Sequence, residues 1–359
     1  MSLHRAIARL SVNFPHAMND ALLSETPLKN GAFVVREEIG RGGSGFTYRA
    51  RDVALGRDVA IKEFFPFGAR REGKIVRADD IKYSMSRAAF VEEARALARF
   101  AHLNIVQVFG VWEENETAYL VTEFLDGQTW QQLVEARGFL PQDEALSLFF
   151  PVCEAVETVH QAEFLHGDNK PDNIISCRDG RVVLLDFGLT RPTSKGAHTT
   201  LLSPQNAQGT AGYAPLEQYS RLARTNPSSD VYALCATLWH LLSGQPPPDA
   251  PDRASGTPLP DLRAMNPSVS VQIEHVLHSG LAMDALARPQ NAHELRTLLE
   301  RNSLPHGDIA PPDLAISSTR LTPSFPTRPT VHDENAVAML IVMSLVLFAA
   351  FFLVMMPHF

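Results

Sequence analysis

Four side chains able to support phosphoryl transfer follow one another within a short part of the chain. Asp168 and Asn173 lie in the run HGDNKPDN, and Asp186 opens a DFG triplet further along. Phosphoryl transfer needs a carboxylate that accepts a hydroxyl proton, oxygen ligands for Mg²⁺ and cations beside the phosphates. Asp168 is therefore the candidate base, Asn173 and Asp186 are candidate metal ligands, and Lys170 is a candidate cation near the γ-phosphate.

A strand is expected between these two motifs. Residues 182–185 are apolar and β-branched, which predicts a short strand that would hold the DFG triplet beside the HGD run. An isolated DFG triplet is usually a turn, and an isolated HGD is usually a capped loop. The order and spacing of the two motifs together carry the prediction.

A glycine-rich turn precedes them in the run IGRGGSGFTY. Gly40, Gly42 and Gly45 have GxGxxG spacing, and glycine lets a backbone approach phosphate with its amide hydrogens. A dinucleotide-binding fold uses the same spacing but continues as a helix, whereas this chain continues as strands into VAIK. Lys62 of VAIK then supplies a cation for the α- and β-phosphates.

An acidic partner for Lys62 is expected in the segment FVEEARALARF, whose apolar residues have helical spacing. Glu93 lies beside the apolar stripe and is the predicted ion-pair partner. Glu92, the next residue, is the competing choice. A solvated helical carboxylate is the ordinary explanation of either, so this prediction depends on the other motifs.

A hinge is predicted at residues 124–127, where the order of elements changes from strands to helices. The segments before it predict an antiparallel meander followed by a hairpin, and those after it predict helices. Adenine would meet backbone groups of Glu123 and Leu125 at such a hinge, with the small Thr122 behind them.

The composition limits the class of protein. A chain of 359 residues with 45% hydrophobic content is long enough to bury a substantial core. The formal net charge of −8 argues against a general nucleic-acid binder, because affinity for phosphate backbones comes from clustered Lys and Arg. Cys153, Cys177 and Cys235 form no CxxC motif, which suggests neither a zinc site nor a disulfide framework and fits a reducing cytoplasm.

The two ends of the chain differ from its middle. Residues 1–32 contain no apolar run long enough for a signal peptide and are expected to form an N-terminal arm. Residues 301–335 are rich in Pro, Ser and Thr, which predicts a flexible linker. Residues 336–356 contain no charged residue and would be about 31 Å long as a helix, which predicts a transmembrane helix.

Taken in order, these motifs resemble the bacterial family of eukaryotic-like serine/threonine protein kinases. The resemblance implies an α+β, two-lobed protein-kinase-like fold with an antiparallel β N-lobe and a helical C-lobe, to which a C-terminal transmembrane helix would be added. The predicted division is an N-terminal arm at 1–32, a protein kinase domain at 33–300 with lobes at 33–123 and 128–300, a linker at 301–335 and a transmembrane helix at 336–356.

The resemblance also implies ATP and Mg²⁺ as cofactors, with Mn²⁺ as a substitute for Mg²⁺. It gives Asp168 the role of catalytic base and Lys170 that of the phosphate-contacting lysine typical of Ser/Thr specificity. The residues implied to bind ATP are Gly40, Gly42, Gly43, Gly45, Ala60, Lys62, Glu93, Thr122, Glu123, Leu125 and Ile175, and those implied to bind the metal are Asn173 and Asp186. The implied supporting contacts are Thr210 with Asp168 and Lys170, Glu217 with Arg288, Asp230 with the catalytic loop, and His166 with Phe187.

Two motifs depart from the family pattern. The usual HRD is HGD here, with Gly167 in place of arginine, and the usual APE is PLE at residues 215–217. The missing guanidinium would normally neutralise a phosphate on the activation segment. The chemistry of transfer does not require it.

Two other classes of protein remain as alternatives. HGD followed by Asn also resembles small-molecule phosphotransferases of the aminoglycoside and choline kinase kind. Lys170 with Pro171, the complete glycine loop and the run GTAGYAPLEQY favour the protein kinase, because that run resembles a docking segment for an extended peptide. A pseudokinase interaction module is the other alternative, although no motif residue is missing.

The expected partners follow from this interpretation. They are ATP, the Ser/Thr hydroxyls of protein substrates, and a lipid bilayer contacted through residues 336–356, with no nucleic acid. The kinase domain is expected in the cytoplasm, where ATP is, so the chain would be a single-pass, tail-anchored protein of the inner (plasma) membrane. The predicted span contains no GxxxG, so dimerisation is not indicated.

Overall fold

The computed structural model describes residues 20–78, 81–186, 209–220 and 225–303. By its contacts the chain divides into a unit at 1–305 and a second at 306–359, and the second lies outside the described residues. The predicted linker from residue 304 and the predicted transmembrane helix at 336–356 therefore lie outside them too. Among the described helices, none combines the length and the apolar character that a membrane span requires.

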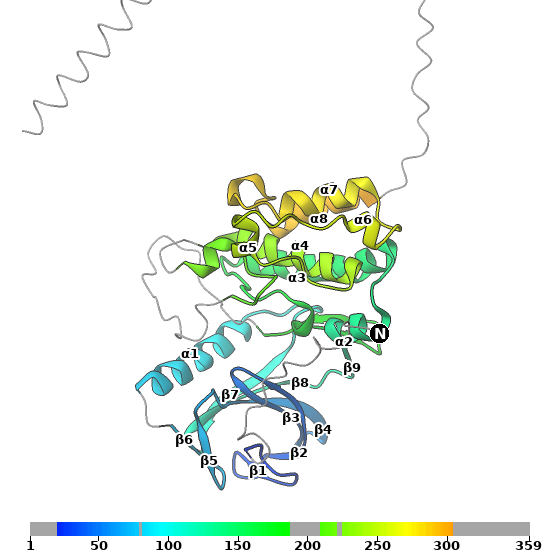
Figure 1. The fold of residues 1–359 in the computed structure, drawn as a ribbon. Helices are drawn as coiled ribbons and strands as arrows, with labels where there is room; N and C mark the ends of the chain where they lie inside the picture. The colour runs from blue at the N-terminus through cyan, green and yellow to red at the C-terminus, as the bar shows by residue number, and fades with distance from the viewer. Residues whose placement is uncertain (1–19, 79–80, 187–208, 221–224, 304–359) are drawn as a thin grey trace, which may run out of the picture. The chain divides into compact units, whose positions relative to one another are not determined.

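The first half of the described chain forms an antiparallel sheet (Figure 1). Its strands pair in the order β1-β2-β3-β4-β8-β7, so the predicted meander and hairpin are present. The strands are β1 Pro27–Leu28, β2 Phe33–Gly42, β3 Gly45–Asp52, β4 Arg57–Phe64, β7 Val108–Glu114 and β8 Thr117–Glu123.

The two faces of this sheet pack against different neighbours, because successive side chains of a strand point in opposite directions. One face carries Tyr48, Ile61 and Tyr119 in a buried cluster. On the other face Phe64 and Leu120 pack against α1 Ile81–Leu97. Ala60 and Lys62 alternate along β4 with the residues of the first cluster and are only partly buried.

The part of the expected N-terminal arm that the structure describes belongs to this sheet. β1 pairs with the start of β2, and Leu22 and Leu28 are buried in the same cluster as Tyr48. The stretch between β4 and α1, whose function the sequence does not indicate, contains a hairpin of β5 Arg70–Glu72 and β6 Ile75–Arg77.

A buried carboxylate connects these added segments to strand β4. Glu63 is fully buried and accepts hydrogen bonds from the hydroxyls of Tyr48 at 2.8 Å and Tyr119 at 3.0 Å. Arg71 of β5 binds the same carboxylate with two nitrogens, at 3.0 and 2.6 Å, and also donates to the carbonyl of Asp20. The hairpin, the N-terminal segment and the strand that carries Lys62 are thus joined at one point.

The second half of the described chain is mostly helical (Figure 1). It also contains a small sheet with the strand order β11-β10-β9, in which β9 precedes α2 along the chain and β10 and β11 follow α3. The elements are β9 Gly127–Thr129, α2 Trp130–Arg137, α3 Gln142–Gln161, η1 Pro171–Asn173, β10 Ile174–Cys177, β11 Val182–Leu184, η2 Leu216–Tyr219, α4 Pro227–Ser243, α5 Ala250–Ala254, α6 Leu262–Met265, α7 Val271–Gly280, η3 Ala285–Ala287 and α8 Ala292–Ser303.

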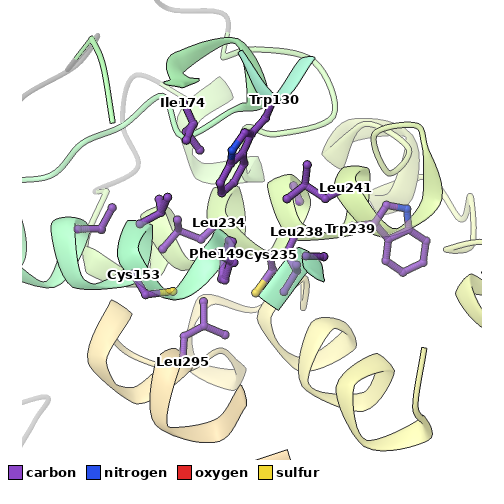
Figure 2. Packing of buried hydrophobic residues seen from close by; sticks show 14 of the residues in the cluster. Trp130, Phe149, Cys153, Ile174, Leu234, Cys235, Leu238, Trp239, Leu241 and Leu295 are labelled. Carbon is purple, nitrogen blue, oxygen red and sulfur yellow. The ribbon is translucent and has the colours of Figure 1, made fainter. Parts of the chain in front are cut away.

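Helix α4 is the centre of this helical part. Residues 228–242 are all buried, as expected for a helix that is largely apolar all round. Its side chains pack against residues of α2, α3 and α8, as Figure 2 shows around Trp130, Phe149 and Leu295. Asn226 caps the helix and Pro227 occupies its first position, so α4 begins three residues before Asp230.

The contact between Arg71 and Glu63 gives a prediction for stability. Arg71→Met leaves the Glu63 carboxylate buried without its cation, so we expect the free energy of unfolding to fall by about 3 to 5 kcal/mol. Arg70→Met, one residue away at an exposed position, is the matched control. Chemical denaturation of both variants measures the difference, and equal stability of the two would contradict the importance of this contact.

Candidate active site

The candidate base is held by side chains from three directions. Asp168 accepts a hydrogen bond from the hydroxyl of Thr210 at 2.8 Å through Oδ1. Its Oδ2 lies 2.7 Å from Nζ of Lys170 and 3.0 Å from Nδ2 of Asn173. Lys170 also donates to Thr210 at 3.2 Å. The carboxylate therefore has a fixed orientation and a cation next to it.

The backbone beneath Asp168 is fixed by another carboxylate, that of Asp230 near the start of α4. Its Oδ2 accepts from the backbone N–H of His166 at 2.9 Å, and its Oδ1 accepts from that of Gly167 at 2.7 Å. The amide of Asn169 donates to Oδ1 at 3.2 Å, and Nε2 of His160 lies 2.9 Å from Oδ2. Burial alone would raise the pKa of Asp230, but the hydrogen bond and charge of His160 outweigh burial and lower it.

His166 connects the catalytic loop to the strand before the DFG triplet. Its Nε2 lies 3.0 Å from the carbonyl oxygen of Leu185, and its Nδ1 lies 3.3 Å from the backbone nitrogen of Asp168. Burial lowers the pKa of His166, so the ring is neutral, donates through Nε2 and accepts through Nδ1. Its predicted neighbour Phe187 lies outside the described residues.

The predicted partner of Lys62 is not the one that the structure gives. Lys62 pairs with Asp186 at 2.6 Å, and among the described residues no ion pair joins Lys62 to Glu93. Glu92 is exposed and pairs with Arg95 on its own helix. Of the two α1 carboxylates, only Glu93 is half-buried and near enough for its charge to raise the pKa of Lys62.

The two carboxyl groups near Lys62, those of Asp186 and Glu93, both have shifted pKa values. Burial alone would raise the pKa of Asp186, but the charge and hydrogen bond of Lys62 outweigh it and lower that pKa. Burial raises the pKa of Glu93 to about 8, because Lys62 offsets only part of that effect. In the unliganded chain, Lys62 therefore neutralises Asp186 and Glu93 holds its proton near neutral pH.

The glycine-rich run is the hairpin between β2 and β3, with Gly42 paired to Gly45. A side chain at Gly42 or Gly43 would meet no other atom within 4 Å, so their backbone faces open space where phosphate can approach. Gly45 has another requirement. Its φ is +144°, and an added Cβ would lie only 1.9 Å from the carbonyl oxygen of Glu63, so close packing on β4 requires glycine there.

The expected adenine-binding residues come together where β4, β8 and the following segment meet. Ala60 on β4 pairs with Thr122 on β8. The side chain of Glu123 accepts from the backbone N–H of Gln107 at 3.0 Å and lies 3.2 Å from two nitrogens of Arg181. This contact of Glu123 with Arg181, in the turn between β10 and β11, was not predicted, because no motif marks Arg181.

The two other residues of the expected adenine site are Leu125, two residues after β8, and Ile175 on β10. Leu125 packs against the core of the helical part, and Ile175 lies on β10 opposite Thr129 and Val183. Their positions are consistent with an apolar floor under a planar ring. Gly127 permits this arrangement, since an added Cβ would lie 2.3 Å from the carbonyl oxygen of Ser176.

The candidate metal ligands are brought together by the backbone. The N–H of Leu185 donates to the carbonyl of Asn173 at 2.7 Å, which places Asp186 next to Asn173. The amide nitrogen of Asn173 is turned toward Asp168, so its side-chain oxygen is the atom left for a cation. Within the described residues no group of three or more His, Cys, Asp or Glu could hold a metal alone. Two oxygen ligands suit Mg²⁺, which takes its other ligands from phosphates and water.

The segment after the DFG triplet is described from residue 209 and is anchored to the helical part. Glu217 binds Arg288 through two contacts, at 2.7 and 3.2 Å, and accepts from the hydroxyl of Ser229 at 2.8 Å. Arg288 is almost fully buried and also donates to the carbonyls of Ala282 and Met283. The expected contacts of Glu217 with Arg288 and of Thr210 with Asp168 are therefore both present.

This fold and this arrangement of charged groups define the class of a phosphoryl-transfer enzyme with two lobes. Residues 33–293 match the family described as protein kinase domain, and the chain belongs to that family. The predicted family, that of bacterial eukaryotic-like serine/threonine protein kinases, and the predicted two-lobed fold are thereby confirmed.

Curated relatives are bacterial kinases. The chain is 29% identical to the serine/threonine-protein kinase PrkC of Bacillus subtilis (strain 168) over 272 residues, which are 74% of this chain and 40% of PrkC. It is 32% identical to the probable serine/threonine-protein kinase PknB of Lactococcus lactis subsp. lactis (strain IL1403) over 269 residues, 73% of this chain and 40% of that protein. The chain thus matches less than half the length of these relatives.

A solved structure resembles the chain as well. It is titled "PpkA-294 apo form", with a TM-score of 0.63 and 32% sequence identity, and the match covers 78% of this chain and 99% of that one. At this identity the likeness extends beyond the general outline of the fold.

The protonation of Glu93 gives a prediction for the unliganded chain. Glutamate in an unfolded chain has a pKa of about 4.3, whereas the folded chain raises that of Glu93 to about 8. The folded state therefore binds more protons between these values, and stability falls as pH rises through them. Glu93→Gln should abolish this loss, and Glu92→Gln should not.

Chemical denaturation without nucleotide, repeated between about pH 5 and about pH 8, measures this difference. The stability of Glu93→Gln relative to the natural chain should grow as the pH rises. A difference that stays constant over that range would show that Glu93 does not titrate there.

Proposed function

We propose that this chain is an ATP-dependent serine/threonine protein kinase, which transfers the γ-phosphate of ATP to Ser and Thr hydroxyls of proteins. The observation that carries the proposal is the contact of Asp168 with Lys170, Thr210 and Asn173 on a backbone fixed by Asp230. A general base must be held within reach of the acceptor hydroxyl, and a cation must stand beside the transferred group.

The proposed reaction uses these side chains as follows. Asp168 accepts the proton of the acceptor hydroxyl, whose oxygen forms the new bond to the γ-phosphorus while the bond to the β–γ bridging oxygen breaks and ADP leaves. Lys170 stabilises negative charge on the transferred group, and Lys62 binds the α- and β-phosphates. Mg²⁺ held by Asn173 and Asp186 would neutralise charge on the phosphates.

Lys62 must change partners for this reaction. In the unliganded chain it pairs with Asp186. The phosphates of ATP and the accompanying cation offer Lys62 and Asp186 stronger partners of opposite charge, so nucleotide binding would separate them. Lys62 could then pair with Glu93, whose carboxyl would lose its proton once a cation stands beside it.

A protein acceptor is favoured over a small molecule by the surroundings of Asp168. The segment at 209–219 passes directly beside the base through Thr210, and Glu217 with Arg288 anchors it to the helical part. An ordered stretch of chain at this place forms a wall along which an extended peptide can lie. The names of the curated relatives also support protein substrates.

The proposal includes a membrane anchor at residues 336–356. Its support is the sequence of this segment, which carries no charge and is long enough as a helix to cross the hydrocarbon layer of about 30 Å. The proline-rich linker at 301–335 would separate the anchor from the kinase domain, which needs cytoplasmic ATP. The protein would then act at the inner face of the plasma membrane.

The catalytic roles give a direct prediction. Asp168→Asn and Lys62→Met should each lower phosphate incorporation from ATP and Mg²⁺ by at least about a hundredfold, because each removes a group that stabilises the transition state. Asp179→Asn and Lys74→Met, which change exposed residues of the same types, serve as controls. Phosphoamino-acid analysis should give phosphoserine and phosphothreonine. Full activity of either active-site variant would refute the assigned roles.

The membrane anchor gives another prediction. The full chain should stay with the membrane fraction through high salt and alkaline carbonate and leave it only with detergent, since a spanning helix is held by hydrophobic burial. A chain that ends at residue 335 should leave the membrane fraction and keep its kinase activity, because a flexible linker makes few contacts with the domain that it tethers. Release of the full chain by salt alone would rule out an inserted helix.

A further inference from the structure

One carboxylate closes the turn that follows Thr210. Asp249 lies between α4 and α5, and its Oδ1 accepts hydrogen bonds from the backbone N–H of Gly212 at 2.5 Å and from the hydroxyl of Tyr219 at 3.0 Å. The two donors stand at the opposite ends of the turn at 212–219. A side chain from a later loop therefore holds both ends of this turn together.

The turn lies beside the place that an acceptor hydroxyl must occupy. Thr210, two residues before it, contacts both Asp168 and Lys170. An acceptor that gives its proton to Asp168 has to come within hydrogen-bond distance of that carboxylate and so must pass next to Thr210. The turn therefore borders the approach to Asp168 on the acceptor side.

The loop before α5 is shaped to receive the turn. The φ of Gly212 is +82°, and an added Cβ would lie 2.9 Å from Cβ of Pro246 and 3.1 Å from the carbonyl oxygen of Pro247. The buried Gly212 therefore packs directly on the prolines that precede Asp249. Proline restricts the backbone before folding, so this loop needs little ordering to hold the carboxylate in place.

Capping of α5 does not account for Asp249. The residue occupies the N-cap position of α5, where an aspartate usually accepts from the second or third backbone N–H of the helix. Here its side chain makes no such bond. Its carboxylate is directed to Gly212 and Tyr219 instead, so the contact with the turn is the one that the structure maintains.

We propose that Asp249 is a positioning residue for the acceptor side of the active site. By closing the turn at 212–219, it fixes the wall along which a protein substrate binds. The proposal rests on the proposed protein kinase function and adds a determinant of substrate binding to it. Asp249 contacts none of the residues assigned to ATP, so its loss affects the acceptor and spares the nucleotide.

The experiment uses the full chain in detergent with Asp249→Ala, Asp249→Asn and Tyr219→Phe variants. Asp252→Ala is the matched control, because it removes the same charge from exposed α5 without a hydrogen bond to the turn. A degenerate Ser/Thr peptide library serves as acceptor. Two further readouts, the KM for ATP and the slow hydrolysis of ATP without peptide, do not depend on the acceptor.

The result expected for Asp249→Ala is a rise of about five- to tenfold in the KM for the peptide library, with the KM for ATP and the hydrolysis rate within about twofold of the natural chain. Tyr219→Phe should give a smaller rise, and combining it with Asp249→Ala should add nothing, because both act through one contact. Asp249→Asn keeps an acceptor oxygen and should recover part of the loss.

Two results would overturn the inference while the proposed function stands. One is a KM for peptide that is the same in Asp249→Ala and Asp252→Ala. The other is a parallel loss of peptide transfer and ATP hydrolysis, which would mean that Asp249 only supports the fold. A natural chain that hydrolyses ATP but phosphorylates no peptide would instead refute the protein kinase function itself, and the role of Asp249 with it.

Discussion

The catalytic loop depends on the buried carboxylate of Asp230. Two consecutive backbone N–H groups, those of His166 and Gly167, point into the protein and bind this carboxylate. A buried charge is costly unless its hydrogen bonds are satisfied, and here His160 and Asn169 complete the set. Helix α4 carries Asp230 and is buried from residue 228 to 242, so the loop is attached to a buried part of the fold. The position of Asp168 follows from this attachment.

The same attachment explains how the loop can work with glycine at position 167. The φ of Gly167 is +77°, a left-handed conformation in which any other residue would be strained. Its N–H binds Asp230, and its carbonyl accepts from the amide of Gln218 at 3.3 Å. The segment at 209–219 is therefore held by Thr210, Gln218 and Glu217 directly. Position 167 has no guanidinium that could bind a phosphate on the activation segment. The contacts of Thr210, Glu217 and Gln218 do not require such a group.

The sequence predicted the parts of the site that lie close together along the chain or belong to ordered motifs. Asp168, Lys170 and Asn173 share one loop, so their spacing alone placed them together. Contacts between distant elements were predicted only where the family resemblance supplied them, as for Glu217 with Arg288. The pairing of Lys62 with Asp186 was not predicted, because periodicity puts Glu93 on the inner side of α1 but does not say how near the helix approaches β4.

Other features could not be predicted because the local pattern suggests something else. Glu63 and Arg71 belong to types that are almost always exposed, and no spacing rule marks them as a buried pair. β1 has only two residues, too few for a strand pattern, so the N-lobe was expected to begin at Phe33 although Leu22 and Leu28 are part of its core. Asp249 has the sequence position of an ordinary helix cap, and only the structure shows that its side chain turns to Gly212.

We expect the catalytic loop to hold Asp168 in place without a phosphate on the activation segment, because Asp230 and Thr210 already fix it. The most direct measurement follows transfer from ATP to a Ser/Thr peptide library by the full chain after treatment with a phosphatase and removal of that phosphatase. Product should form linearly from the first turnovers. A lag that ends only when the chain has phosphorylated itself, or an absence of transfer, would contradict it.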